Sequence, residues 1–217
     1  MSHPFNRGAT IPQPGEIDED LNEFWVDSPW KIQHSHNLSA FERNRTFLNV
    51  EGEHFVEISY LTGTDSDGDG RAVAAADFRN NGQLDLVVRQ VGGGALLLYE
   101  NHFPKRHYLK VSLRGAQRDL MGNGRQSNRL GIGARLIAEV QGRQIVRELF
   151  PRNSFRSQMP SHLHFGLGDA DRVDSLRILW PSGLEQVITD LEADQHVVIE
   201  EGRKTVETVV AGETLAP

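Results

Sequence analysis

The chain has 217 residues, a formal net charge of -7 at pH 7, 38% hydrophobic residues and no cysteine. This length allows one large or two small domains with a buried core. The acidic balance argues against a nucleic-acid-binding protein, because phosphate contacts require a basic surface. The absence of cysteine excludes disulfides, thiol catalysis and zinc–cysteine sites.

Neither a membrane span nor a secretion signal is visible in the sequence. No run approaches the roughly 18 apolar residues that a membrane helix needs. The first residues, MSHPFNRGATIPQPGE, contain no apolar segment of the kind that directs secretion. We therefore expect no membrane insertion and a cytoplasmic protein, or an exported one if the sequence is a trimmed mature form.

Residues 1–37 are predicted to form an N-terminal arm. The segment is polar and has three prolines before residue 15. Leu21, Phe24 and Trp25 lie at helical spacing, so a short amphipathic turn could dock on the main body. Partial disorder and a partner-binding role are the alternatives.

Residues 38–105 read as one antiparallel unit of four or five strands. Short apolar segments alternate with turns rich in Gly, Asp and Asn, and helix signals almost disappear. The predicted strands are RTFLNV, HFVEISYL, RAVAAADF, LDLVVRQV and ALLLYEN. The last two are apolar enough to predict burial on both faces.

The stretch DSDGDG, residues 65–70, raises the question of a calcium loop. Asp65, Asp67 and Asp69 alternate and Gly70 follows, which is a spacing that lets oxygen ligands converge on a hard cation. An EF-hand also needs an acid at its twelfth position, where this sequence has Ala76. A polar turn between strands is the alternative.

Residues 106–202 read as a second β unit, a small sandwich or open barrel, and residues 203–217 as a C-terminal tail. A polar connection over 115–130 has the length of a binding loop or a disordered segment. After it, GIGARLIAEV alternates apolar and polar side chains, and RQIVRELF follows across a Gln141-Gly142 turn. Further strands are predicted at HLHFGLG, VDSLRILW, EQVITDL and HVVIEE. The predicted fold class is all-β.

Two groups of motifs resemble known families. VAAADFRNNGQLDLVV resembles an FG-GAP/VCBS repeat, which occurs in propellers with calcium on their blade loops. NRLGIGARL, HLHFGLG and VDSLRILWPSG, in this order, resemble the ASPIC/UnbV domain of proteins similar to cartilage acidic protein 1. The resemblance implies one propeller-blade-like unit fused to an ASPIC/UnbV domain, over about residues 38 to 201.

The resemblance moves the calcium question downstream of DSDGDG. The repeat's oxygen ligands at positions one, three, five and nine correspond to Asp77, Arg79, Asn81 and Asp85, with Gly82 at the turn. Arg79 brings a positive charge to a ligand position. Either Arg79 replaces the metal by bridging Asp77 and Asp85, or DSDGDG lends its carboxylates to a rebuilt site. The small number of carboxylates favours the metal-free version.

The candidate metal ligands are the oxygen-bearing side chains of these two stretches, namely Asp65, Asp67, Asp69, Asp77, Asn81 and Asp85. The cofactor expectation is therefore either none or Ca²⁺. A single blade-like unit needs a neighbour, since about three repeats are usually required for stability. The neighbour could be the ASPIC/UnbV-like unit, the N-terminal arm or, through a strand edge, a second copy in a homo-oligomer.

A second candidate site consists of polar side chains in the second half of the chain. His162 and His164 share one strand face, as two metal ligands could, and His34 and His36 repeat the spacing. An arginine-rich stretch could bind a carboxylate, phosphate or sugar, or could pair with Glu139 and Glu148. The candidate ligand-binding residues are Asn128, Arg135, Arg147, Arg152, Arg156, Gln158, His162 and His164.

Arg143 belongs to the same arginine-rich stretch. Trp180 ahead of a Pro-Ser-Gly turn reads as a core residue or, alternatively, as an aromatic platform for a ligand.

Two functions remain open at the level of sequence. No catalytic motif was found, which favours a non-catalytic binding or interaction module for a protein, glycan or second copy. The family resemblance also implies a second class, an accessory protein or enzyme of natural-product biosynthesis that shapes or binds a small molecule. That class predicts an apolar cavity near the 115–130 loop and the arginines.

Overall fold

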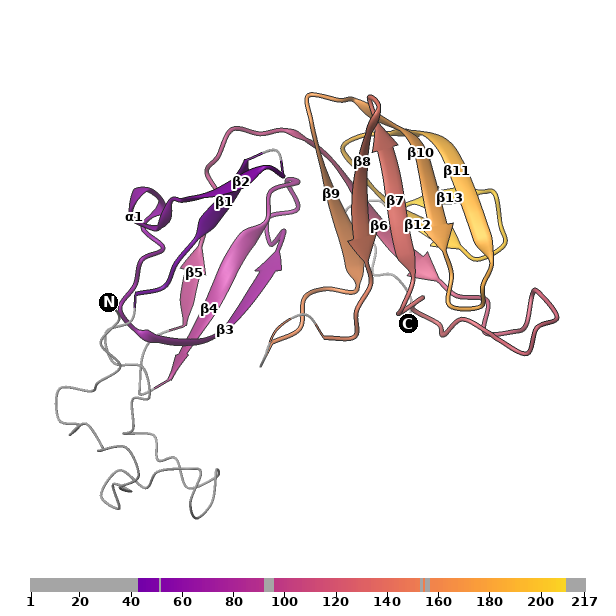
Figure 1. Cartoon of the computed structure of the whole chain (residues 1–217), viewed down its shortest axis with the longest axis horizontal. Helices are drawn as coiled ribbons and strands as arrows, with labels where there is room; N and C mark the ends of the chain where they lie inside the picture. The colour runs from indigo at the N-terminus through magenta and orange to yellow at the C-terminus, as the bar shows by residue number, and fades with distance from the viewer. Residues whose placement is uncertain (1–42, 51, 92–95, 153, 155–156, 210–217) are drawn as a thin grey trace, which may run out of the picture. The chain divides into compact units, whose positions relative to one another are not determined.

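The computed structural model describes residues 43–209, except 51, 92–95, 153 and 155–156 (Figure 1). Strands dominate this part of the chain, and its one helix is the short α1 (Ser59–Thr62). The predicted all-β class is confirmed. The expected arm at 1–37 lies outside the described residues. The chain divides into unit 1, Met1–Ala74 with Leu86–Tyr99, and unit 2, Ala75–Asp85 with Glu100–Pro217.

The strands predicted for residues 38–105 all form, but in two sheets. β1 (Phe47–Val50) and β2 (His54–Glu57) make an antiparallel hairpin. β3 (Asp69–Ala76), β4 (Asp85–Val91) and β5 (Leu97–Tyr99) make a three-stranded sheet in that order. The last residues of β3 and the first of β4 belong to unit 2.

One expected strand ends early in the structure. HFVEISYL is a strand only as far as Glu57, and the chain then turns into α1. The hydroxyl of Ser59 accepts a hydrogen bond from the Thr46 amide at 2.8 Å, and the Thr62 hydroxyl donates to the Ile58 carbonyl at 2.9 Å. Such local side-chain bonds compete with a strand ladder. Gly63, at φ 67°, ends the helix.

Many large apolar side chains of unit 1 are exposed, and no apolar side chain described in this unit is fully buried. Phe55, Leu96 and Leu98 are 68%, 65% and 57% exposed, so the predicted burial of the ALLLYEN strand on both faces is wrong. The buried side chains described in unit 1 are the polar Ser59, Thr64 and Gln90. The apolar strands are present, but among the described residues of this unit no second layer covers them.

Unit 2 contains two four-stranded sheets (Figure 1). One has the order β11-β10-β7-β8 and is antiparallel throughout. Its strands are β7 (Arg135–Val140), β8 (Arg143–Glu148), β10 (Arg172–Leu179) and β11 (Glu185–Glu192).

The second sheet has the order β13-β12-β6-β9 and is mixed, because β6 and β12 run parallel. Its strands are β6 (His107–Arg114), β9 (His162–Gly168), β12 (Gln195–Glu200) and β13 (Val206–Thr208).

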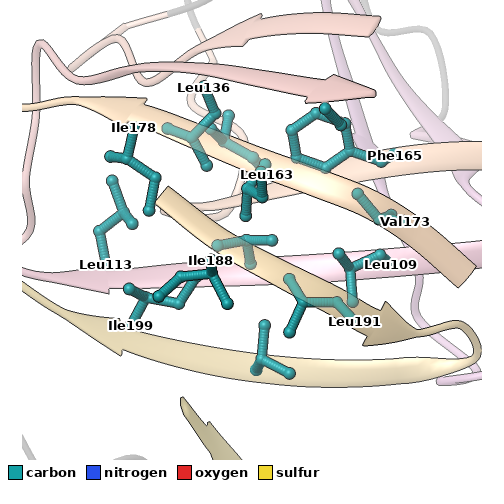
Figure 2. Close-up of a cluster of buried hydrophobic side chains, with 14 of the residues drawn as sticks. Leu109, Leu113, Leu136, Leu163, Phe165, Val173, Ile178, Ile188, Leu191 and Ile199 are labelled. Carbon is teal, nitrogen blue, oxygen red and sulfur yellow. The ribbon is translucent and has the colours of Figure 1, made fainter. Parts of the chain in front are cut away.

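The two sheets of unit 2 enclose one hydrophobic core (Figure 2). Alternate residues of each strand point inward, as the period of two requires. Leu109, Phe165 and Ile199 come from one sheet, and Leu136 and Ile178 from the other. Of the sandwich and the open barrel, the structure is therefore the sandwich.

The alternation predicted for GIGARLIAEV is confirmed. Leu136, Ala138 and Val140 are fully buried, while Arg135 and Glu139 are exposed. The turn at Gln141-Gly142 also forms, with positive φ at both residues, as a two-residue hairpin turn requires. Trp180 is buried, and its Nε1 donates to the side chain of Gln186 at 3.0 Å, so it is a core residue.

Two strands of the second sheet were not expected. β6 precedes the predicted connection and is central in its sheet, between β12 and β9. β13 lies within the predicted C-terminal tail and pairs with β12. β6 carries Lys110 and Ser112 among its apolar residues, and β13 has three residues, so the apolar signal of both is weak.

The connection over 115–130 has no strands but is held by side chains. Glu201 is 3% exposed and accepts hydrogen bonds from the Ala116 amide and the hydroxyls of Ser127 and Ser182, at 2.8, 2.8 and 2.5 Å. A buried carboxylate needs such donors. Glu201 thereby fastens both ends of the connection to the turn that carries Ser182.

Candidate functional site

The outward face of the sheet β13-β12-β6-β9 carries a cluster of polar and aromatic side chains. The residues between the core positions of β6 are Tyr108, Lys110 and Ser112, and those of β9 include His162 and His164. His196 on β12 joins them, since it is paired in register with Lys110. Together with the loop at residues 77–85, these six side chains form what we term the outer-face cluster.

Asp77 and Lys110 form a buried ion pair in this cluster. Lys110 Nζ lies 3.1 Å from Asp77 Oδ2, and the two side chains are 5% and 1% exposed. The amides of Asn81 and Gly82 donate to the same carboxylate at 2.9 and 2.8 Å, and Lys110 also donates to the Asn80 side chain. Burial alone would raise the pKa of Asp77, but these donors outweigh it and lower the pKa.

Asp85, the second acid of the loop, is bound by Arg79. Arg79 Nη2 donates to Asp85 Oδ1 at 2.8 Å and to the carbonyl of Asn101 at 2.9 Å. The Asn101 amide donates to the same Asp85 oxygen at 2.8 Å. The expected bridge from Arg79 to both acids does not form: Arg79 pairs with Asp85, whereas the cation at Asp77 is Lys110. Lys110 could not be paired with Asp77 from the sequence, because the two residues are 33 positions apart.

Asn81, the remaining expected ligand of this loop, stabilises the turn. Its side-chain oxygen accepts a hydrogen bond from the amide of Gln83 at 3.0 Å. Gly82 adopts φ 85°, and a Cβ at this position would lie 2.1 Å from the Tyr108 ring. Glycine is therefore required here for both conformation and space.

His164 is engaged by the same loop. Its Nε2 lies 2.8 Å from the Gly82 carbonyl oxygen, so this nitrogen donates the proton. The ring stacks on Tyr108, with centroids 5.7 Å apart and planes 4° apart. Burial lowers the pKa of His164, although the bond to Gly82 opposes that effect.

His162 and His196 approach each other over Ser112. Their ring centroids are 5.2 Å apart, and Nε2 of His196 lies 2.8 Å from the Ser112 hydroxyl. Burial, with help from the neighbouring His196 and Lys110, lowers the pKa of His162 to about 4. Burial and Lys110 also lower the pKa of His196. Both rings are therefore neutral at pH 7.

DSDGDG leads into β3, and its last two residues belong to that strand. Asp65 accepts a hydrogen bond from Arg43 Nη1 at 2.8 Å, and Ser66 Oγ accepts one from the side chain of Gln90 at 2.8 Å. Asp67 is exposed, and the side chain of Asp69 lies outside the described ones. In the described part of the chain, no three His, Asp or Glu side chains converge as a metal site.

The remaining candidate residues are spread over unit 2. The side-chain amide of Asn128 donates to the Ile132 carbonyl and accepts from the Ile132 amide. Arg135 Nε lies 3.6 Å from Glu148 Oε1. Arg147 donates to the His164 carbonyl at 3.1 Å. The side chains of Arg152 and Gln158 are exposed, and Arg156 lies outside the described residues. A ligand site made by this set stays a prediction.

The geometry defines the class of protein first: an all-β chain whose folded core is a β-sandwich with a polar outer face. Residues 124–206 match the family model described as ASPIC and UnbV, so this part of the chain is an ASPIC/UnbV domain, as expected. β6 precedes the matched range, yet it is a central strand of the sandwich. The search of curated proteins returned no match.

The resemblance of residues 38–105 to an FG-GAP/VCBS repeat stays a prediction. Among the described residues, no helix is long and apolar enough to cross a membrane.

Proposed function

We propose that the protein is a non-catalytic interaction module that binds a second copy of itself through unit 1. The observation that carries the proposal is the distribution of apolar side chains. Every buried hydrophobic side chain among the described residues lies in unit 2. The large hydrophobic side chains exposed in unit 1 are Phe47, Leu48, Phe55, Val56, Tyr60, Leu61, Val73, Leu96 and Leu98.

Such a surface is costly in water and is typical of a protein interface. Among the described strands, β5 lies at the edge of its sheet, with Leu98 exposed on it, so it can add a strand of another chain. A second copy satisfies this geometry without any further partner, because a two-fold axis sets the same edge against itself. The sequence predicts a single blade-like unit, and such a unit needs a neighbour to cover its faces, which also favours a second copy.

Sedimentation equilibrium over a wide concentration range tests this proposal. The wild-type chain should be a dimer, and Phe55→Ser with Leu98→Ser should weaken the dimer by roughly tenfold or more, given about 25 cal/mol for each Å² of apolar surface. The control is Val187→Ser, which removes an exposed apolar side chain from unit 2. A wild-type chain that stays monomeric at every concentration would contradict the proposal, as would equal weakening by the control.

We also propose that the loop at 77–85 keeps its shape without calcium. Lys110 and Arg79 supply positive charge to Asp77 and Asp85 at 3.1 and 2.8 Å, where a calcium loop would place its ion. Thermal unfolding of metal-stripped protein with and without millimolar Ca²⁺ tests this. A ligand that binds the folded state raises the melting temperature. We expect no shift in the wild type and a lower melting temperature for Asp77→Ala.

A calcium-dependent rise in the melting temperature that Asp65→Ala abolishes would instead assign Ca²⁺ to DSDGDG. Asp65→Ala is thus the matched control, since it removes one carboxylate outside the 77–85 loop.

A further inference from the structure

His162 and His196 are the part of the outer-face cluster that the loop at 77–85 does not engage directly. They lie on β9 and β12, the two strands that flank β6, and Ser112 of β6 lies opposite His162 in register. Their rings are tilted by 56°, with centroids 5.2 Å apart. Side chains of strands that do not pair with each other have thus been brought into contact above the sheet.

This separation is what one shared metal ion requires. A metal bound to one nitrogen of each ring, at roughly 2.0–2.1 Å, lies about 3.2 Å from each ring centroid. At a tetrahedral angle the two centroids are then about 5 Å apart. The rings of His162 and His196 therefore already have the spacing of two ligands of a tetrahedral ion.

The chemical state of the two rings also suits a metal. Imidazole binds a metal in its neutral form, and burial lowers the pKa of both histidines. The His162 ring makes no hydrogen bond within the described part of the chain, so its nitrogens are available. Lys110, the cation that acts on both rings, is itself in an ion pair with Asp77.

His164 is not one of the two proposed metal ligands. Its Nε2 donates to the Gly82 carbonyl and its ring stacks on Tyr108, whereas the ring in contact with His162 is that of His196. The pair His162 and His164, which the i, i+2 spacing favoured, is therefore replaced by a pair from two strands. His196 could not be matched to His162 from the sequence, because the parallel pairing of β6 and β12 brings them together.

We propose that His162 and His196 form a site for a divalent transition metal of the zinc type, with the Ser112 hydroxyl beside it and water completing the coordination. Two imidazoles and no carboxylate suit Zn²⁺ or Cu²⁺ rather than Ca²⁺. With two protein nitrogens the site is open, so it would bind the ion more weakly than a closed four-ligand site does.

Isothermal titration of the full-length protein with ZnCl₂ tests the proposal. All variants should carry His34→Ala and His36→Ala, because that pair has metal-ligand spacing and lies outside the described residues. We expect one saturable site, and roughly tenfold or greater loss of affinity in His162→Ala and in His196→Ala. His164→Ala and His107→Ala are the matched controls and should keep the site.

Imidazole nitrogen NMR signals supply a second readout that does not depend on truncated variants. Zinc should shift the ring signals of His162 and His196 and leave those of His107 unchanged. Absence of saturable binding, binding that survives both single substitutions, or equal loss in the two controls would each overturn the proposal.

Discussion

Lys110 decides the electrostatics of the outer-face cluster. It is a buried cation whose hydrogen-bond partners, Asp77 and Asn80, both belong to the segment that it stabilises. Removing one member of a buried ion pair leaves an unpaired charge, which usually costs about 3–5 kcal/mol. A neutral replacement of similar shape isolates that effect from the loss of packing.

We predict that Lys110→Met lowers the free energy of unfolding by about 3 kcal/mol. Adding Asp77→Asn should recover part of the loss, because the unpaired carboxylate is then gone. Urea denaturation of the two single variants and the double variant measures the coupling. A cost below about 1 kcal/mol for Lys110→Met would mean that the pair is already solvated.

The lowered pKa values of the histidines make the free energy of unfolding fall as the pH falls. The pKa of His162 is about 4 in the folded chain against 6.5 for the free side chain, so the unfolded chain binds more protons between these values. The free energy of unfolding should therefore be flat above pH 6.5 and fall as the pH drops towards 4. The fall is at most about 3 kcal/mol, reduced by the partial exposure of the ring.

His164, His196 and Asp77 also have lowered pKa values and act in the same direction. Urea midpoints at several pH values measure the slope, and His162→Gln should flatten it in this window. A wild-type stability that rises as the pH falls from 6.5 to 4 would contradict the assignment.

At the scale of elements, the start of the 115–130 connection packs closely against its end. Substitution of Gly115, the residue that follows β6, tests this close approach. A Cβ on Gly115 would lie 2.0 Å from the backbone oxygen of Asn128. A backbone atom cannot move aside as a side chain can. Gly166 on β9 has no neighbour within 4 Å of its Cβ position.

We predict that Gly115→Ala costs about 2 kcal/mol or more, since overpacking forces the backbone to shift. Gly166→Ala should change the stability by less than about 0.5 kcal/mol. Thermal unfolding of the two variants side by side checks the pair. Equal stability of the two variants would show that the connection is free to move away from β6.

Elements with strong alternation could be predicted from the sequence, and those with mixed signals could not. GIGARLIAEV and the Gln141-Gly142 turn carry clear periodicity and turn chemistry, and both form as expected. The pattern of HFVEISYL did not predict α1, because hydrogen bonds of the Ser59 and Thr62 hydroxyls stabilise that turn. The parallel pairing of β6 with β12 joins residues 86 apart in sequence, Leu109 and Gln195, and no local pattern encodes it.

The candidate sites show the same limit. Asp77, Asp85 and His164 were found from motifs, but their partners Lys110, Asn101 and Tyr108 lie elsewhere in the chain. Conversely, the apolar strands of residues 38–105 were found while their exposure was not, since burial depends on what packs against a strand. The apolar pattern of a segment predicts a strand more reliably than it predicts which residues pack against that strand.

At the scale of the whole molecule, the two units differ in kind. Unit 2 has a closed hydrophobic core between two sheets, whereas the described side chains of unit 1 that are buried are polar. A sheet without a packed face is expected to open locally and to gain stability from association. We therefore expect unit 1 to gain stability by self-association.

The most direct test is amide hydrogen exchange of the full-length chain at low and high protein concentration. We predict that the amides of β1, β2 and β5 become more protected as the concentration rises, while those of β6 to β12 stay unchanged. Exchange of β1, β2 and β5 that does not depend on concentration would contradict it, and the exposed apolar side chains of unit 1 would then require a different partner.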